Sequence, residues 1–197
     1  MDGIMIALRF RDWLMQRFRR LRGDQRGTSA IEFALLLPLM LTLYISGVEI
    51  SQAVGADRKV TLIAHTVADL VAQTSTPLAA TDVSNALSAA GAIATPYSSG
   101  NLKVVVSQVK IDAQGKATID WSQATPANTA RNPGDPVTLP TSTDGVNTIN
   151  AANTCLIWGE TTYAYTPQLG YAITGTLNLY DQIYMAPRLK TCVTYTG

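Results

Sequence analysis

The hydrophobic pattern of this 197-residue chain begins with one long apolar run at residues 30–48. No formally charged residue occurs within positions 33–48. A helix that crosses a hydrocarbon core of about 30 Å needs roughly 20 predominantly apolar residues, with about 17 as the lower limit. The run meets this length, so we predict a transmembrane helix here.

The helical pattern continues beyond the run with a narrower apolar face. Apolar residues recur there at spacings of three and four, the period of an amphipathic helix. These residues are Val60, Ile63, Val67, Leu70 and Val71. We therefore predict one helix from about residue 30 to about residue 73. Pro38 removes one of its backbone hydrogen bonds, and either a bend or a local unwinding is expected there.

Strand patterns dominate the remainder of the chain. After a short second helix, with its N-cap at Thr81 or Asp82 and its end near Ala92, alternation over residues 102–111 and 117–121 predicts a hairpin. The segment 122–150 is rich in turn formers and is expected to be a long irregular loop. The final third is rich in Thr, Tyr and β-branched residues, which favours two or three more strands.

These elements predict an α+β fold. A long N-terminal transmembrane and amphipathic helix precedes a small, antiparallel, β-rich exported domain. The expected divisions are a basic leader at 1–27, a transmembrane helix at 28–49, its amphipathic continuation at 50–75 and the exported periplasmic or extracellular domain at 76–197.

Net charge changes sign across the apolar run. Residues 1–27 contain seven arginines and three aspartates, whereas residues 28–197 contain eight basic and eleven acidic residues. Positive charge beside a span marks the cytoplasmic side, so the N-terminus is expected in the cytoplasm and the residues after Glu49 outside it. The arginines lack aromatic interleaving or a nucleic-acid-binding motif, and no nucleic-acid partner is expected.

Glu32 is an acidic residue at the start of the apolar run. Such a side chain costs about 2.5–3.5 kcal/mol at the centre of a membrane helix and less near its end, so its default interpretation is functional. Alternatively, the span begins at Phe33, and Glu32 only stabilises the helix N-terminus from the headgroup region.

The residues around Glu32 resemble a known N-terminal segment. An arginine-rich leader ends at Gly27, four residues from Thr28 to Ile31 follow, and Glu32 and the aromatic Phe33 precede the apolar helix. This arrangement is similar to the TadE/TadG-like family of minor pseudopilins of the tight-adherence (Flp) pilus, which are type IVb prepilin-like proteins. The resemblance covers about the first 75 residues.

The resemblance implies a function in pilus biogenesis and surface adhesion, as a minor pilin or pseudopilin. A prepilin peptidase would cut between Gly27 and Thr28, and Glu32, beside Phe33, would pair with the N-terminal amine of a neighbouring subunit during assembly. The implied partners are that peptidase, other pilins, the assembly platform and the membrane. The implied location is the bacterial inner membrane, crossed once, with the C-terminal domain in the periplasm and a further destination in a surface pilus.

Cys155 and Cys192 both lie in the part expected to be exported. An oxidising compartment permits a disulfide, and closing a loop of this length stabilises by about 3–4 kcal/mol in the chain-entropy model. We predict that they pair. A zinc site would need further Cys or His ligands nearby, so neither a metal nor a cofactor is expected.

Catalytic patterns are weak in this sequence. The single histidine, His65, lies on the predicted helix without Cys, Asp or Glu at ligand spacing, and no phosphate-binding, dinucleotide-binding or zinc-protease motif occurs. Asp82 and Ser84 begin an Asp-x-Ser-x-Ser metal motif that Ala86 breaks. We expect no enzyme and no small-molecule substrate, although paired-carboxylate hydrolysis stays open.

Two alternatives to a pilin stay open. An ordinary secretory signal would place a small-x-small cleavage site at residues 51–53, but the long basic region, Glu32 and the long apolar run argue against it. A signal-anchored surface module unrelated to pili would bind a ligand through the 122–150 loop and its tyrosines. The tyrosines that would serve either as a binding surface or as half-buried strand residues are Tyr163, Tyr165, Tyr171, Tyr180, Tyr184 and Tyr195.

Overall fold

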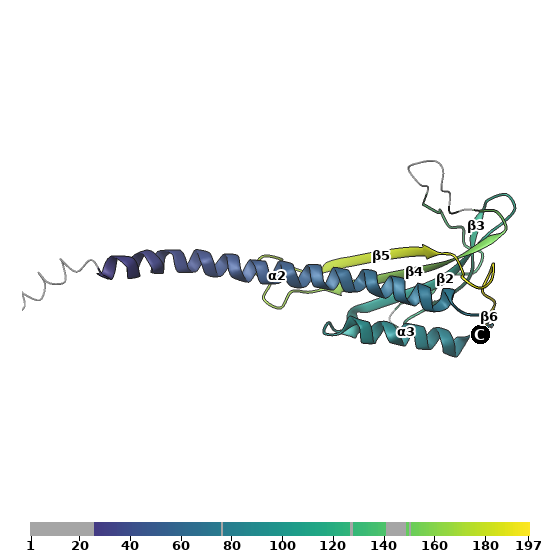
Figure 1. Ribbon diagram of the computed structural model, residues 1–197, viewed down its shortest axis with the longest axis horizontal. Helices are drawn as coiled ribbons and strands as arrows, with labels where there is room; N and C mark the ends of the chain where they lie inside the picture. The colour runs from purple at the N-terminus through teal and green to yellow at the C-terminus, as the bar shows by residue number, and fades with distance from the viewer. Residues whose placement is uncertain (1–25, 76, 127, 141–148, 150) are drawn as a thin grey trace, which may run out of the picture. The chain divides into compact units, whose positions relative to one another are not determined.

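The structure is a computed structural model that describes residues 26–75, 77–126, 128–140, 149 and 151–197. Nearly all of the leader predicted at 1–27 therefore lies outside the described residues. The chain divides into two compact units, Met1–Val48 and Glu49–Gly197. Each unit is described by itself below, and Figure 1 shows their helices and strands.

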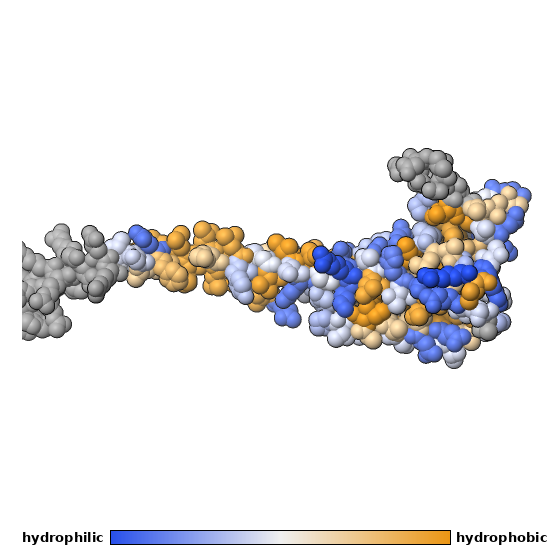
Figure 2. All heavy atoms as spheres, in the orientation of Figure 1, coloured by the Kyte–Doolittle hydropathy of each residue, from blue (hydrophilic) through white to orange (hydrophobic). Residues whose placement is uncertain are grey.

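Helix α2 spans Arg26–Ala72, which confirms one long helix over the predicted region. It is long and apolar enough to cross a membrane. In the first unit its large apolar side chains are exposed, and Figure 2 shows them as an almost continuous hydrophobic surface. These side chains are Ile31, Phe33, Leu35, Leu36, Leu37, Leu39, Met40, Leu41, Leu43 and Tyr44.

The helix continues through Pro38 without a break in the single chain, and a local unwinding when subunits assemble stays a prediction. The Thr42 hydroxyl donates to the Pro38 carbonyl oxygen at 2.7 Å, and the Ser46 hydroxyl donates to the Thr42 carbonyl oxygen at 2.8 Å. Hydroxyls that bond back to the preceding turn in this way do not need water. The hydroxyls of Thr42 and Ser46 are thus compatible with a lipid environment.

The second unit contains a four-stranded antiparallel sheet. Strands β2 (Leu102–Ile111) and β3 (Ala117–Ala124) form the predicted hairpin, and β4 (Thr154–Tyr165) and β5 (Leu177–Met185) complete the order β3-β2-β4-β5. The Asp112 carboxylate orders the hairpin turn by accepting the Gln114 and Lys116 N–H groups at 2.9 and 2.8 Å. A long helix followed by an antiparallel sheet confirms the α+β class.

The principal core lies between one face of the sheet and two helices, the second half of α2 and α3 (Ala80–Ala94). The buried positions of α2 recur every three or four residues, which confirms the predicted period and four of the five predicted residues. The fifth, Leu70, is wrong, because its side chain is 44% exposed. The buried members of the principal core include Ala56, Val60, Ile63, Val67, Ala68, Val71 and Ala72 from α2, Val83, Ala90 and Ala94 from α3, and Leu102, Val104, Val106, Trp121, Ile157, Tyr163 and Tyr165 from the sheet.

The predicted N-cap of α3 is wrong. The helix begins two residues earlier than Asp82, after an N-cap at Ala79. Asp82 lies inside the first turn, and its carboxylate accepts the Ala79 N–H at 3.1 Å. Either position of an acid satisfies free N–H groups at a helix start, so the sequence alone did not distinguish them.

The outer edge of β3 is covered by part of the segment predicted as an irregular loop. The Val137 N–H donates to the Ala117 carbonyl at 2.9 Å, and the Ile119 N–H donates to the Asp135 carbonyl at 2.9 Å. These bonds satisfy backbone groups that an exposed edge strand would leave open. Val137 and Leu139 also cover a smaller apolar cluster on the second face of the sheet, around Trp158.

Two short strands close the second unit. Strand β1 (Leu78–Ala79) pairs in parallel with β6 (Tyr195–Thr196), and the 3-10 turn η1 (Ser99–Asn101) precedes β2. Val193, just before β6, is buried in the principal core. The segment around β6 is therefore an integral part of this unit.

Gly159 on β4 permits close contact between the sheet and α2. A Cβ atom at this position would lie 2.7 Å from the Ala64 carbonyl oxygen and 3.0 Å from the Ala68 Cβ. Because both atoms belong to a packed helix, Gly159→Ala is expected to lower the free energy of unfolding by about 1–3 kcal/mol, the usual cost of overpacking. Chemical denaturation of the full chain measures this effect. Gly115→Ala is unsuitable as the control because of its positive φ, whereas Gly100→Ala has room and is expected to change stability little.

Candidate functional site

The predicted processing and assembly residues lie in the first two turns of α2. Gly27 and Thr28 are exposed, and nothing lies within 4 Å of a Cβ built on Gly27. Arg26 and Gly27 are both helical.

Glu32 presents a carboxylate on an otherwise apolar surface. Its side chain is exposed, and its neighbours Ile31, Phe33 and Leu36 are exposed apolar residues. Among the residues that the structure describes, the two ion pairs are Arg131 with Glu160 and Arg188 with Asp69, so neither involves Glu32. The Glu32 carboxylate can therefore form an ion pair with a cationic group of another molecule.

Glu49 is a second acidic residue on α2 in a different environment, and sequence reasoning missed its role. Its side chain is 2% exposed, and its carboxylate accepts the backbone N–H groups of Tyr171, Ala172 and Ile173 at 2.9, 2.7 and 3.2 Å. These residues belong to the loop between β4 and β5. Three charge-assisted hydrogen bonds hold that loop against the helix.

The disulfide predicted between Cys155 and Cys192 is confirmed. It joins β4 to the segment before β6 across a sequence separation of 37 residues, and the structure describes no free cysteine. The bond fixes one end of the segment that leads into the core at Val193.

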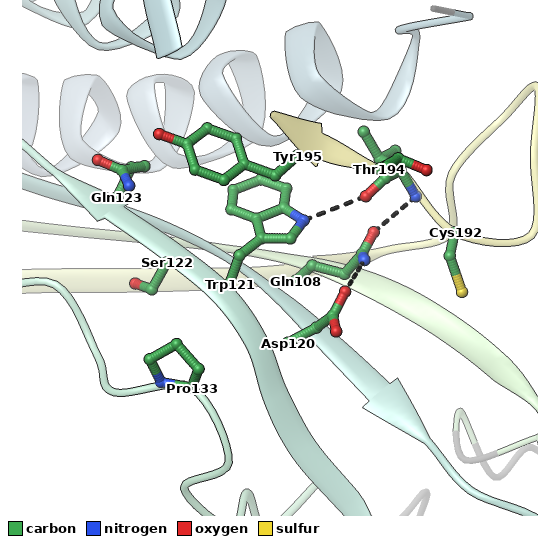
Figure 3. A pocket seen from close by; sticks show the side chains of 10 residues that line it. Gln108, Asp120, Trp121, Ser122, Gln123, Pro133, Cys192, Thr194 and Tyr195 are labelled. Atoms are coloured by element: carbon green, nitrogen blue, oxygen red, sulfur yellow. Dashed lines mark hydrogen bonds between the residues drawn. The ribbon is translucent and has the colours of Figure 1, made fainter. Parts of the chain in front are cut away.

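A set of polar side chains holds the backbone of Val193, next to the disulfide. The buried Gln108 accepts the Val193 N–H at 2.7 Å and donates to the Asp120 carboxylate at 2.6 Å, while the Trp121 indole N–H donates to the Val193 carbonyl at 3.1 Å. The Tyr195 ring stacks on Trp121 (Figure 3), and the two ring centroids are 5.3 Å apart. These groups line an open hollow of about 450 Å³. Because Gln108 and Trp121 both bond to the chain's own backbone, we interpret their role as structural.

The second face of the sheet carries an aromatic and charged cluster. Arg131, from the loop after β3, binds the Glu160 carboxylate through two nitrogens at 2.8 and 2.6 Å. Its guanidinium carbon lies 3.9 Å from the centroid of Trp158, on which Tyr184 also stacks at 5.1 Å. The hydrogen bond to Glu160 raises the pKa of Arg131. This two-pronged contact fastens the loop to the sheet.

The tyrosines considered from the sequence differ in burial. Tyr163 and Tyr165 are buried in the principal core, whereas Tyr171 and Tyr180 are exposed. Partial burial, together with the nearby Glu160 charge, raises the pKa of Tyr184 to about 12. The pKa of Tyr180 is raised as well, by partial desolvation of its hydroxyl and by the charge of Glu160 and the hydrogen bond to it. Both hydroxyls are therefore protonated at neutral pH, and the Tyr180 hydroxyl donates to Glu160 at 3.1 Å.

The described residues hold no group of three or more His, Cys, Asp and Glu side chains arranged to bind a metal ion. His65 is exposed on α2. Asp82 bonds to the backbone at the start of α3, as described above.

Comparison with known proteins agrees with the N-terminal geometry. Residues 27–69 match the family model described as TadE-like protein. No curated protein and no solved structure gives a significant match to the chain. The matched segment contains Gly27, Thr28, Glu32 and the helix that carries them. Over residues 27–69, the chain is therefore similar to TadE-like proteins, in agreement with the resemblance found in the sequence.

Proposed function

We propose that this protein is a minor pilin or pseudopilin of a tight-adherence (Flp) pilus. The observation that carries the proposal is Glu32, a solitary carboxylate on the apolar surface of α2, within the segment that matches TadE-like proteins. Tight-adherence pili are the assemblies with which this family is associated. The chain is thus a component of the pilus or of its assembly machinery.

In this mechanism, a prepilin peptidase cleaves the bond between Gly27 and Thr28 and creates a new amine at Thr28. The amine of one subunit then pairs with Glu32 of a neighbour. Pairing offsets the desolvation of both charges in a low-dielectric environment. The exposed apolar side chains of α2 then leave the lipid and pack against the helices of other pilins. This transfer is possible because the surface of those helices is as apolar as the lipid.

The proposed topology follows from the charge asymmetry of the sequence. The seven arginines of residues 1–27 stay in the cytoplasm, and the unit from Glu49 onward lies in the periplasm. The periplasm is oxidising, which agrees with the disulfide between Cys155 and Cys192. We further propose that the protein is a substrate of the peptidase and has no catalytic activity of its own.

A ligand-binding module is the second candidate. It is favoured by an open hollow of about 470 Å³ next to Arg131, with Trp158, Gln182 and Tyr184 in its lining. Against it, the guanidinium of Arg131 is already bound by Glu160, and the Trp158 indole N–H donates to Gln182 at 3.1 Å. Polar groups that satisfy one another have little capacity left for a ligand.

N-terminal sequencing distinguishes these functions. The protein should be recovered from membranes of cells that contain a prepilin peptidase, and we expect the mature chain to begin at Thr28. The same cells without the peptidase provide the control and should yield the uncut chain. A start at Met1 in both strains would favour a simple anchor, and a start near Val54 would identify a secreted protein and contradict the pilin proposal.

A further inference from the structure

Loop 166–176, which joins β4 to β5, has an unusual surface for an exported domain. It contains no charged residue. Its side chains Leu169 and Tyr171 are 68% and 59% exposed. Clustered exposed apolar side chains on an uncharged segment mark a contact with an apolar partner.

Glu49 fixes the position of this loop along α2. Its carboxylate binds three consecutive backbone N–H groups of the loop, at residues 171–173. Figure 1 shows the β4–β5 connection beside the helix. Since Glu49 directly follows the apolar run that ends at Val48, the loop lies beside the residue at which the predicted span ends.

Neighbouring segments at this end of the second unit are uncharged as well. The connection 95–101 contains no charge, and its Tyr97 hydroxyl donates to the Gln52 carbonyl at 3.0 Å. Residues 50–56 of α2 are also uncharged, and two of them, Ile50 and Val54, are exposed apolar residues. Because Glu49 is buried beneath the loop, the first exposed charge on α2 after Glu32 is Asp57.

The thickness of a membrane favours lipid as the partner of this surface. Residues 33–56 as a helix measure roughly 36 Å at about 1.5 Å per residue. A bilayer has a hydrocarbon core of about 30 Å and a total thickness of about 40–45 Å with its headgroups. The end of this uncharged segment thus reaches the headgroup layer, where tyrosine side chains are enriched. The exposed Arg58 and Lys103 follow, and cations there are attracted to anionic lipids.

We propose that loop 166–176 lies in the headgroup layer of the membrane that α2 crosses, with Leu169 and Tyr171 inserted at its boundary with the acyl chains. Glu49 holds the loop in this position and at the same time removes its own charge from the apolar surface. The loop adds a second membrane contact to the single span. This inference requires the span but does not depend on peptidase processing or on pilus assembly.

A depth measurement on the full chain tests the inference. Since Cys155 and Cys192 are paired, Leu169→Cys introduces a single reactive thiol, which can carry an environment-sensitive fluorophore. The labelled protein is placed in vesicles of phosphatidylethanolamine and phosphatidylglycerol at low protein density. We expect a blue-shifted emission, and stronger quenching by a nitroxide near the headgroup than by one near the acyl-chain end. Gln114→Cys, in the exposed hairpin turn, is the matched control and should give aqueous emission with little quenching.

Two further variants make each outcome decisive. Leu39→Cys lies within the predicted span and should be quenched most strongly by the deep nitroxide, while Glu49→Ala should reduce the quenching at position 169 by releasing the loop. If Leu39 is quenched but Leu169 behaves like Gln114, the span stands and the inference is wrong. If neither is quenched, both are wrong. A blue-shifted emission at position 169 that disappears on dilution, together with crosslinking between copies, would assign the surface to another subunit. That result would overturn the inference.

Discussion

Replacing Glu32 with leucine is expected to leave the protein in the membrane and to remove it from assembled pili. Insertion should persist because the substitution makes the exposed surface of α2 more apolar. Incorporation should fail because the Thr28 amine of the neighbouring subunit would be buried without its counter-charge. Breaking such a pair costs about 3–5 kcal/mol, which is roughly a 100-fold or greater loss of incorporation at about 1.4 kcal/mol per tenfold.

Quantifying the protein in sheared pili and in membranes measures both parts of this expectation. Asp57→Leu is the matched control, because it removes an exposed acidic side chain from the same helix outside the predicted span. Glu32→Gln separates charge from shape and should resemble Glu32→Leu. Normal incorporation of Glu32→Leu would refute the pairing role, whereas its loss from the membrane would indicate that Glu32 acts in insertion.

Removing the disulfide is the second large effect that we expect. Cys155→Ser, Cys192→Ser and the double variant should each lower the free energy of unfolding by about 3–4 kcal/mol, as expected for a closed loop with a sequence separation of 37 residues. The three values should agree, because each variant breaks the same bond. Denaturant titration in detergent, followed by tryptophan fluorescence, measures them.

A reductant added to the unaltered protein should reproduce this loss of stability and serves as the control.

The Val193 backbone is also held by Gln108 and Trp121, so the segment has a second attachment. Trp121→Phe leaves the Val193 carbonyl without its donor, at a cost of about 1–3 kcal/mol. Since both changes loosen one segment, their effects should not add. A disulfide contribution below about 1 kcal/mol would mean that this second attachment is sufficient.

The sequence predicted those helices and strands in which the spacing of apolar residues directly reflects the secondary structure. Helix α2 and the β2–β3 hairpin could be predicted because the spacing of their apolar residues matches the period of the final structure. Gly27 and Glu32 were selected because their spacing and position before an apolar helix form a short motif, and their roles stay a prediction. The disulfide followed from composition, since the chain has two cysteines.

The remaining contacts depend on residues far apart in sequence. The Glu49 carboxylate accepts backbone N–H groups of residues more than a hundred positions later in the sequence. The side chains of residues 171–173 form no pattern that would predict an anion-binding site. Arg131 lies in a segment with the composition of a loop. Its hydrogen bond to Glu160 and its contact with the Trp158 ring nevertheless hold it against the sheet. Both contacts exist only after the sheet has placed its connections, so a local pattern contains no signal for them.

The position of β6 determines when the second unit can finish folding. Residues 192–196 supply one cysteine of the disulfide, the buried Val193 and the strand that pairs with Leu78, so they complete contacts begun by segments synthesised much earlier. Contacts between such distant segments form slowly, because a long chain must close before they add stability. We therefore expect the core of the second unit to be completed only after residues 192–196 have emerged, because until then the Trp121 indole N–H lacks its acceptor on Val193.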